Sequence, residues 1–444
     1  MVSIEKAYST DKFFILGIGG SGMSSIAKYL IESGSTVVGY DQRKSQITNQ
    51  LLKMDIDVRN DVNFKIIKGS IVIASSAIKS NNELLLQAKN EGIKVISRPN
   101  FLTSLTKQYK TIGVAGTHGK TTTTALLSHI YQYNNVDCSY IYGGMTSYSG
   151  IGGHYGNSGE LVLESDEAFK TYLDFEHENL IVTNIDDDHI DHYGSFNLLV
   201  ESFSSVIEKT KSKPILNIDD KSLYEIAKKV DSISYGSNPE SEYRYLGGKT
   251  ILRKGIEIEM NPSVPGDHFM MNSLATLAHA DFKGFELEKT IDAINTFPGV
   301  KRRMELIGTS NGVSVYDDYG HHPTEMKATI NAIKSITQGN LYVIFQPHRY
   351  TRTQLLFDRF IEPLSEADES YILDIYSAGE APIPGISSKV LLERGSPNNI
   401  HYVSSTRSAI EIIVEKAVDG DTVLTLGAGD VTLVGPKIIG ISND

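Results

Sequence analysis

Cysteine is nearly absent from this chain of 444 residues, in which Cys138 is the single example. No disulfide can form within the chain and no cysteine-rich metal site can be built, so a reducing compartment is the simplest expectation. No apolar run approaches the ~18 residues of a membrane-spanning helix. The opening residues, MVSIEKAYSTDK, lack the apolar core of a signal peptide. We therefore expect a soluble, cytoplasmic protein with no membrane partner.

Basic residues are also in short supply, because 42 lysines and arginines stand against 54 acids and the net charge is -12. That balance argues against a general nucleic-acid-binding surface, which needs a basic face. Local basic pockets on an acidic protein can still bind anionic ligands. Low-complexity segments and short repeats are missing as well, and the length predicts about three domains at ~150 residues each.

The sequence is instead organised as apolar runs rich in Val, Ile and Phe that alternate with longer segments of helical period. This alternation predicts an α/β fold with parallel sheets. We place the domain boundaries near 108 and 298, which gives domains at 1–107, 108–297 and 298–444. The irregular stretch 236–266, with short alternating runs such as GIEIEM, predicts a small antiparallel patch. Strands are expected at FFILG (13–17), TVVGYD (36–41), SIVIASS (70–76), TIGVA (111–115), LVLE (161–164), LIVTNI (180–185), PILNID (214–219), VSVYDD, LYVIFQPH, ESYILDIY, IHYVS and DTVLTLGAGD.

A first glycine turn joins the first expected strand to a helix. Gly17, Gly19 and Gly22 form G-x-G-x-x-G there, and Asp41 ends the next strand. Such glycines let the backbone approach a diphosphate at a helix N-terminus, and the acid can bind a ribose. Taken alone, the turn favours an NAD-dependent dehydrogenase. Any diphosphate, including that of a UDP-sugar, suits the same geometry, and a tight turn without a ligand is the plain alternative.

A second glycine turn follows the strand TIGVA and also opens a helix. Its backbone N–H groups can cradle phosphates, Lys120 can neutralise the β and γ oxygens, and the Thr121 hydroxyl can hold Mg²⁺. The strict phosphate-loop spacing is not kept, because Val114 stands where the first glycine belongs and Gly116 comes two residues later. A lysine and a hydroxyl at the mouth of a strand–turn–helix still favour nucleotide binding over turn chemistry alone.

Acidic residues follow two of the expected central strands. Glu164 ends LVLE, and Asp188, His189 and Asp191 follow LIVTNI. Ligands gather at the carboxyl ends of parallel strands, and Mg²⁺ prefers oxygen ligands. Glu164 is therefore a candidate ligand of the metal or of a metal-bound water, and His189 a direct or second-layer ligand.

The third domain carries clusters of polar residues at expected strand ends. Arg302 and Arg303 lie at its entry, and arginine suits the planar recognition of carboxylate or phosphate. Solvated surface charge is the plain alternative for each residue taken singly, whereas the shared position after strands favours a site for anionic groups. The clusters are Asp317-Asp318-Tyr319-Gly320-His321-His322-Pro323, Gln346-Pro347-His348-Arg349-Tyr350-Thr351-Arg352 and Gly427-Ala428-Gly429-Asp430.

Together these segments resemble the Mur ligases of peptidoglycan synthesis, in family order and across all three expected domains. DDYGHHPTE with FQPHRYTRT is the more specific part and is similar to the alanine-adding branch. The segments that carry the resemblance are GIGGSGMSSIA (17–27), GTHGKTTTT (116–124), TNIDDDHID (183–191), GVKRR (299–303), DDYGHHPTE (317–325), FQPHRYTRT (345–353) and GAGD (427–430).

The resemblance implies a Rossmann-like N-terminal domain for the UDP part of a sugar nucleotide, a central ATPase domain and a Rossmann-like C-terminal domain. It implies that substrate contacts come from Gly19, Gly20, Ser21, Gly22, Met23, Asp41, Tyr319 and His321. It implies that ATP contacts come from Gly116, Thr117, His118, Gly119, Lys120, Thr121, Thr122, His268, Asn272 and Arg303. The Mg²⁺ ligands that it implies are Thr121, Glu164 and His189, and the catalytic residues are Lys120, His189, His348, Arg349 and Arg352.

Three positions depart from the family pattern. Phe269 replaces the first Asn of a pair near the adenine, so that only His268 and Asn272 remain, and its ring could offer a stacking face instead. Phe169 stands where a second acid often follows the segment Glu164–Glu167. The lysine that is carbamylated in later Mur ligases has no counterpart near residue 205, as expected of the alanine-adding branch.

The activity implied is ATP-dependent ligation of L-alanine to the carboxylate of UDP-N-acetylmuramate through an acyl phosphate, by a monomer or homodimer. Lys120 and Mg²⁺ would position and stabilise charge, and His189 and His321 are open candidates for the base. The nearest rival is the ligase that attaches a whole tripeptide to the same sugar nucleotide. A nicotinamide-dependent oxidoreductase and a catalytically weakened binding protein are the alternatives from other classes.

Overall fold

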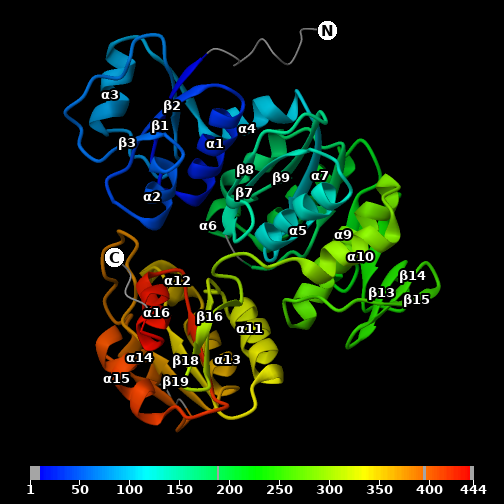
Figure 1. The fold of residues 1–444 in the computed structure, drawn as a ribbon, viewed down its shortest axis with the longest axis vertical. Helices are drawn as coiled ribbons and strands as arrows, with labels where there is room; N and C mark the ends of the chain where they lie inside the picture. The colour runs from blue at the N-terminus through cyan, green and yellow to red at the C-terminus, as the bar shows by residue number, and fades with distance from the viewer. Residues whose placement is uncertain (1–10, 188–189, 394–396, 441–444) are drawn as a thin grey trace. The chain divides into compact units, whose positions relative to one another are not determined.

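The computed structural model describes residues 11–187, 190–393 and 397–440. They form two compact units, one within residues 11–261 and 271–298 and the other within residues 262–270 and 299–440. Each unit is built on parallel-rich sheets with helices, so the α/β prediction is confirmed (Figure 1). None of the helices in the described part of the chain combines the length and apolar character that a bilayer crossing requires.

The first unit begins with a five-stranded parallel sheet of order β3-β2-β1-β4-β5. The order reverses next to β1, so the glycine turn that follows this strand lies at the switch point where doubly wound sheets bind ligands. Its strands are β1 (Lys12–Leu16), β2 (Thr36–Tyr40), β3 (Asp57–Arg59), β4 (Ile71–Ala74) and β5 (Lys94–Ser97), and its helices are α1 (Ser21–Glu32), α2 (Gln46–Leu52), α3 (Glu83–Asn90) and α4 (Arg98–Thr106).

The same unit continues with a ten-stranded sheet of order β15-β14-β13-β12-β11-β10-β6-β9-β7-β8. Its middle is parallel, and β8, β14 and β15 run antiparallel to their neighbours, so the antiparallel patch expected in 236–266 is confirmed at one edge. The strands are β6 (Lys110–Ala115), β7 (Ser139–Thr146), β8 (Gly150–His154), β9 (Glu160–Glu164), β10 (Asn179–Val182), β11 (Ile215–Asn217), β12 (Ile233–Gly236), β13 (Tyr243–Gly247), β14 (Thr250–Arg253) and β15 (Ile256–Glu259).

Helices pack on this sheet where their apolar faces require it. In α7, Leu199, Phe203, Val206 and Ile207 follow the pattern i, i+4, i+7, i+8 of one helix face, and all are buried. The Ser195 hydroxyl accepts from the Leu198 N–H and so begins this helix. The helices are α5 (Lys120–Tyr133), α6 (Ile190–Tyr193), α7 (Phe196–Glu208), α8 (Lys221–Ala227), α9 (Asp267–Lys283) and α10 (Leu287–Thr296), with a 3₁₀ helix η2 (Ala168–Asp174).

Helix α1 joins the two sheets of the first unit by packing on the β7–β8 hairpin. The Ser25 hydroxyl donates to the Tyr142 carbonyl at 2.7 Å, and the Lys28 ammonium donates to the Ser149 carbonyl at 2.7 Å. A side chain at Gly153 would place its Cβ 2.0 Å from the Ser25 carbonyl oxygen, so only glycine allows this approach. The first glycine turn is thereby fixed relative to the central sheet.

The second unit has a six-stranded sheet of order β16-β17-β21-β18-β19-β20, parallel except for β16. Its central strand β18, LYVIF, is buried along its length and wholly apolar. The strands are β16 (Glu305–Ser310), β17 (Val313–Asp318), β18 (Leu341–Phe345), β19 (Glu369–Ile372), β20 (Ile400–Tyr402) and β21 (Thr422–Leu426), and the helices are α11 (Pro323–Ile336), α12 (Tyr350–Leu355), α13 (Ile361–Ser365), α14 (Ser388–Glu393), α15 (Thr406–Lys416) and α16 (Val434–Ile438).

Candidate functional site

The second glycine turn connects the buried strand β6 to helix α5 and leaves no room for side chains at its glycines. Gly116 and Gly119 have φ of +124° and +84°, which side chains rarely adopt. A Cβ at Gly116 would lie 2.1 Å from the Thr183 hydroxyl, and one at Gly119 would lie 2.8 Å from Oδ1 of Asn272. The turn is therefore a bare backbone surface at a helix N-terminus, the form that phosphate-binding loops take.

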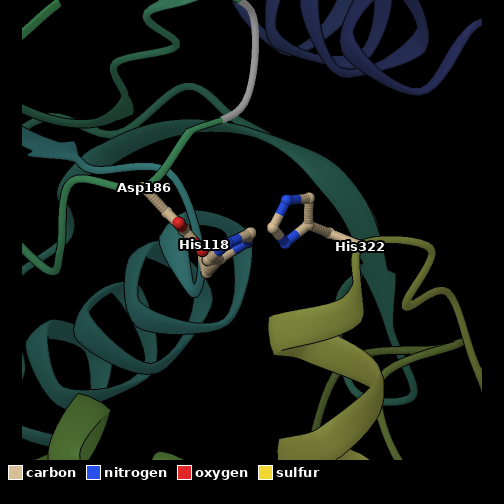
Figure 2. A group of neighbouring side chains, drawn as sticks. All are labelled: His118, Asp186 and His322. Carbon is tan, nitrogen blue, oxygen red and sulfur yellow. Dashed lines mark hydrogen bonds and ion pairs between the residues drawn. The ribbon is translucent and has the colours of Figure 1, made fainter. Parts of the chain in front are cut away.

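Residues that follow β10 brace this turn from one side. The Thr117 and His118 N–H groups donate to the backbone carbonyl and side-chain Oδ1 of Asn184, and the Thr183 hydroxyl donates to the His118 carbonyl at 2.6 Å. The His118 ring lies 3.0 Å from an Asp186 carboxylate oxygen. Figure 2 draws both side chains. Thr183, Asn184 and Asp186 belong to the segment TNIDDDHID, and local sequence gives no sign that they contact this turn.

Lys120 is the first residue of α5, and its ammonium group turns back into the loop. It donates to the carbonyls of Gly116 and Thr117 at 2.7 and 3.1 Å, and to both carboxylate oxygens of Glu167 at 2.8 and 3.1 Å. Burial disfavours the charged lysine, but the carboxylates of Glu167 and Asp166 outweigh that effect and raise the pKa of Lys120. Lys120 is therefore a fixed cation, and Glu167 is a partner that the sequence did not indicate.

Thr121 and Glu164 meet beside this turn. The Thr121 hydroxyl donates to one Glu164 carboxylate oxygen at 2.6 Å, and the Gly143 N–H donates to the other. Hydroxyl and carboxylate oxygens are the donors that Mg²⁺ prefers. Thr122 lies half-buried in the first turn of α5. His189, the third implied ligand, and Asp188 lie outside the described residues, and of Asp191 only the backbone is described.

The first glycine turn leads into α1, and Gly20 is the N-cap residue of this helix. The Gly19 N–H donates to a carboxylate oxygen of Asp41 at 2.9 Å, and the Arg43 N–H donates to the other. Asp41 therefore holds the turn in shape through its carboxylate. Met23 contributes its side chain to the core, where it is 2% exposed, so only its backbone faces the turn.

Two observations enlarge this first site beyond what the sequence indicated. A Cβ at Gly22 would lie 2.9 Å from a guanidinium nitrogen of Arg98, the first residue of α4. The buried Nε of Arg98 has no hydrogen-bond partner among the described residues. A Cβ at Gly143 would lie 3.4 Å from the Ser21 hydroxyl and 3.3 Å from the Glu164 carboxylate. Gly143 therefore lies between the start of α1 and the Glu164 carboxylate that Thr121 contacts.

In the second unit, aromatic and basic side chains from two clusters form a continuous series. The guanidinium groups of Arg302 and Arg303 lie 4.9 and 5.1 Å from the Tyr319 ring centre, within the range of cation–π attraction. The His321 ring lies edge-on to Tyr319, with its centre 5.4 Å away, and 5.9 Å from that of His348. The expected residues Arg303, Tyr319, His321 and His348 are thus brought together. Figure 2 also draws His322, which stands at the start of α11.

Arg302 and Arg303 differ in what they contact. Arg302 has φ of +60° and donates to the Asp317 carboxylate at 3.2 Å and the Gly427 carbonyl at 2.8 Å, so it fastens the entry of this unit to the GAGD turn. Arg303 lies 3.7 Å from a carboxylate oxygen of Glu325, and both groups are partly exposed. Arg303 is therefore the better placed of the pair to meet an anionic ligand.

The loop after β18 carries the three residues expected to be catalytic in this unit. Arg349 adopts φ of +71° and donates through Nε to Glu380, whose other oxygen accepts from the Thr351 N–H. The His348 ring stacks on Tyr376 at 5.6 Å, and Arg352 approaches its Nδ1 at 3.4 Å. Burial, followed by the charges of Arg352 and Arg349, lowers the pKa of His348 to about 4, so this ring is neutral near pH 7.

The start of α9 carries the residues at which the sequence departs from the family. Phe269 is 1% exposed, so the hypothesis that its ring offers a stacking face is wrong, because the ring is part of the core. Burial lowers the pKa of His268 to about 4. Asn272 is buried, and its Oδ1 would lie 2.8 Å from a Cβ at Gly119.

Comparison with known protein families covers nearly the whole chain. Residues 12–110 match "Mur ligase family, catalytic domain", residues 114–280 match "Mur ligase middle domain", and residues 302–429 match "Mur ligase, glutamate ligase domain". The three matches follow one another in the order of the three sheets. They do not overlap.

Individual relatives extend this likeness over full length. A UDP-N-acetylmuramate–L-alanine ligase of Pelotomaculum thermopropionicum is 35% identical over 442 residues, covering 96% of each chain. One of Thermobifida fusca is 32% identical, covering 96% of this chain and 95% of its own. The crystal structure of the UDP-N-acetylmuramate–alanine ligase of Thermotoga maritima gives a TM-score of 0.82 at 25% identity, covering 96% of this chain and 98% of that one. A murein peptide ligase of Psychrobacter arcticus shares the fold, with a TM-score of 0.71 at 23% identity and coverage of 97% and 98%.

Proposed function

This chain belongs to the Mur ligase family, and from that premise we propose that it joins L-alanine to the carboxylate of UDP-N-acetylmuramate with ATP. The observation that carries the proposal is the full-length likeness to ligases of that name, at 32% and 35% identity over 96% of this chain. The loop FQPHRYTRT, typical of the alanine-adding branch, favours L-alanine over the tripeptide of the rival ligase. An oxidoreductase would explain only the first glycine turn.

The reaction needs ATP because a carboxylate has too poor a leaving group for attack by an amine. A carboxylate oxygen of the sugar nucleotide attacks the γ-phosphorus, and the bond to ADP breaks to leave an acyl phosphate. The alanine amine then attacks the acyl carbon and loses a proton, and inorganic phosphate leaves. The protein's part in such a sequence is positioning and stabilisation of charge.

The second glycine turn fits a nucleotide phosphate chain. Its two glycines leave a cradle that any Cβ would fill, and Lys120 supplies a cation at its base. Asn272, buried against Gly119, and the braced backbone of His118 keep the cradle in shape before a nucleotide arrives. We assign residues 108–297 to ATP binding on this ground.

The donors beside this turn also fit Mg²⁺. Thr121 and Glu164 would hold the ion with their oxygen atoms, and His189 is proposed as a further ligand from the family resemblance. When bound, the ion supplies positive charge that neutralises the phosphates. Gly143 fixes one Glu164 oxygen through its N–H, which leaves the carboxylate oriented toward Thr121.

The first glycine turn is proposed to hold the diphosphate of the sugar nucleotide. The turn ends at an α-helix N-terminus, and the Arg98 guanidinium packs against it. Because Ser21 and Glu164 both flank Gly143, a diphosphate on this turn would place its sugar near the ATP site. Residues 1–107 are assigned to the sugar nucleotide, and the whole reaction is placed in the cytoplasm.

The second unit is proposed to bind the acceptor. Arg349 is held by Glu380, so Arg352 is the arginine that we assign to the alanine carboxylate. Neutral His348 can accept or donate a hydrogen bond there without adding charge. Tyr319, His321 and Arg303 are proposed to contact the acyl phosphate side of the substrates.

Phosphate release by the full-length protein tests the proposal. The mixture holds ATP, MgCl₂, UDP-N-acetylmuramate and L-alanine, and each is left out in turn. We expect release only from the complete mixture, with a product whose mass is that of the sugar nucleotide plus alanine minus water. Release that does not depend on the sugar nucleotide, or no alanine adduct, would overturn the assignment.

A further inference from the structure

The ammonium group of Lys120 is fully engaged within the protein. It carries three donors, and four oxygen atoms lie within hydrogen-bonding distance, two from the backbone of its own turn and two from Glu167. A nucleotide phosphate would be a further acceptor for the same three donors. Lys120 can therefore reach a phosphate oxygen only if it gives up contacts that it makes now.

The ion pair with Glu167 is the contact of Lys120 that costs the most free energy to break. Its side chain is 1% exposed, and in the part of the chain that the structure describes Lys120 is the only side chain that donates to its carboxylate. Burial raises the pKa of Glu167 to about 7, although the charge of Lys120 works against that shift. A buried carboxylate that loses its only cation is strongly disfavoured. Phosphate charge at the same turn would add repulsion.

The surroundings keep Glu167 in this place. The Tyr193 hydroxyl donates to the Glu167 backbone carbonyl at 2.7 Å, and Glu167 directly precedes the 3₁₀ helix η2. Asp166, the neighbouring acid, differs from Glu167 in its distance from Lys120 and in its exposure to water. Its carboxylate lies 3.9 Å from the Lys120 ammonium, and its side chain is 34% exposed. Water can compensate Asp166 when Lys120 moves, whereas it cannot reach Glu167.

We propose that Glu167 is a positioning residue that holds Lys120 back in the glycine turn and competes with nucleotide phosphate for its ammonium group. The proposal deepens the proposed function, on which it rests, because it concerns the nucleotide site of that reaction. Nucleotide binding then includes a transfer of Lys120 from Glu167 to the phosphate. The same competition weakens the hold on the product ADP and favours its release.

The affinity of the full-length protein for ADP, measured by titration calorimetry with and without MgCl₂, tests this competition directly. Glu167→Gln keeps the size of the side chain and removes its charge, and we expect ADP to bind roughly 2- to 150-fold more tightly, the span of coupling between contacting residues. Asp166→Asn is the matched control and should change the affinity less than about twofold. Unchanged or weaker ADP binding by Glu167→Gln would mean that Glu167 does not compete, and the proposal would be wrong.

A double-mutant cycle separates an action through Lys120 from a general effect of charge. In the background of Lys120→Met, the change Glu167→Gln should leave ADP affinity unaltered, because the competed group is gone. If it tightens ADP binding equally in both backgrounds, Glu167 repels phosphate without acting through Lys120, and the proposal fails. Equal affinity of all four proteins for UDP-N-acetylmuramate verifies their folding. If the unaltered protein binds no ADP at millimolar concentration, the ligase assignment itself fails, which is a different result from tight binding that Glu167→Gln does not change.

Discussion

The Thr121 hydroxyl donates to a carboxylate oxygen of Glu164 across 2.6 Å, which joins the start of α5 to the end of β9. The other Glu164 oxygen is held by the Gly143 N–H. Gly143 also lies against Ser21, at the start of α1. One short stretch of β7 therefore connects the proposed Mg²⁺ ligands with the proposed sugar-nucleotide turn. A Cβ at residue 143 would meet the Glu164 carboxylate at 3.3 Å, so these groups are closely packed.

Glu164→Gln should raise the MgCl₂ concentration needed for half-maximal ligation. The amide keeps the hydrogen bond to Thr121 but lacks the negative charge, so we expect a shift of at least about tenfold, with partial recovery at high MgCl₂. Phosphate release measured across a MgCl₂ series gives the answer. Asp174→Asn, at an exposed acid on the same connection, should leave the series unchanged. An unchanged series for Glu164→Gln would remove Glu164 from the metal site.

Lys120→Met should abolish ligation, with a loss of at least about 10²–10³ in turnover, because a preorganised cation stabilises phosphoryl charge. The structure adds an expectation about stability. The substitution leaves Glu167 buried without its cation, which typically costs about 3–5 kcal/mol. Thermal unfolding should therefore show destabilisation that Glu167→Gln largely reverses, while activity stays lost. Near-normal turnover of Lys120→Met would exclude this turn from the reaction.

Arg98→Ala should weaken binding of the sugar nucleotide and leave binding of ATP unchanged. Hydrogen bonds to charged groups contribute about 1.5–3 kcal/mol, so the KM for UDP-N-acetylmuramate should rise about tenfold or more while the KM for ATP stays constant. Arg59→Ala is the matched control, since Arg59 is exposed and paired with Asp57. NAD at millimolar concentration should not compete with the sugar nucleotide. Equal effects on both KM values would mean that Arg98 has a structural role only.

Arg352→Lys should raise the KM for L-alanine more than the KM for ATP, because lysine keeps the charge but loses the planar fork. Arg349→Lys should behave differently. Arg349 is committed to Glu380 and holds a strained φ of +71°, so its loss should lower stability and affect all substrates together. Steady-state kinetics of the two variants, varied in each substrate, distinguish these roles. The reverse pattern would place Arg349 rather than Arg352 at the acceptor.

The α/β fold could be predicted because the buried strands of each sheet appear in the sequence as apolar runs between segments of helical period. Short or edge strands such as β3, β5 and β8 were not expected, since three to five residues carry too little periodicity to be distinguished from loops. The two glycine turns could likewise be predicted from local sequence. Glu167, Asn184 and Arg98 could not, because their importance depends on which residue lies opposite them. Nothing in the sequence pairs Glu167 with a lysine 47 residues earlier.

Burial was the other property that local sequence did not reveal. Phe269 stands at a position where a polar residue was expected, and its aromatic character suggested an exposed stacking surface. In the fold its ring is part of the core and is 1% exposed. The surroundings of Gly143 were hidden in the same way. Local sequence shows only a strand glycine, whereas the fold places it against Ser21 of α1 and Glu164 of β9.

The identity of the acceptor tests the central claim most directly. The full-length protein is given ATP, MgCl₂ and UDP-N-acetylmuramate with either L-alanine or the tripeptide L-Ala-γ-D-Glu-diaminopimelate, and phosphate release and product mass are followed. L-alanine should be used efficiently, with glycine and L-serine as slower substitutes, because discrimination by one methyl group is only about 1–3 kcal/mol. Efficient use of the tripeptide with no reaction of L-alanine would contradict the account and make this chain the recycling ligase.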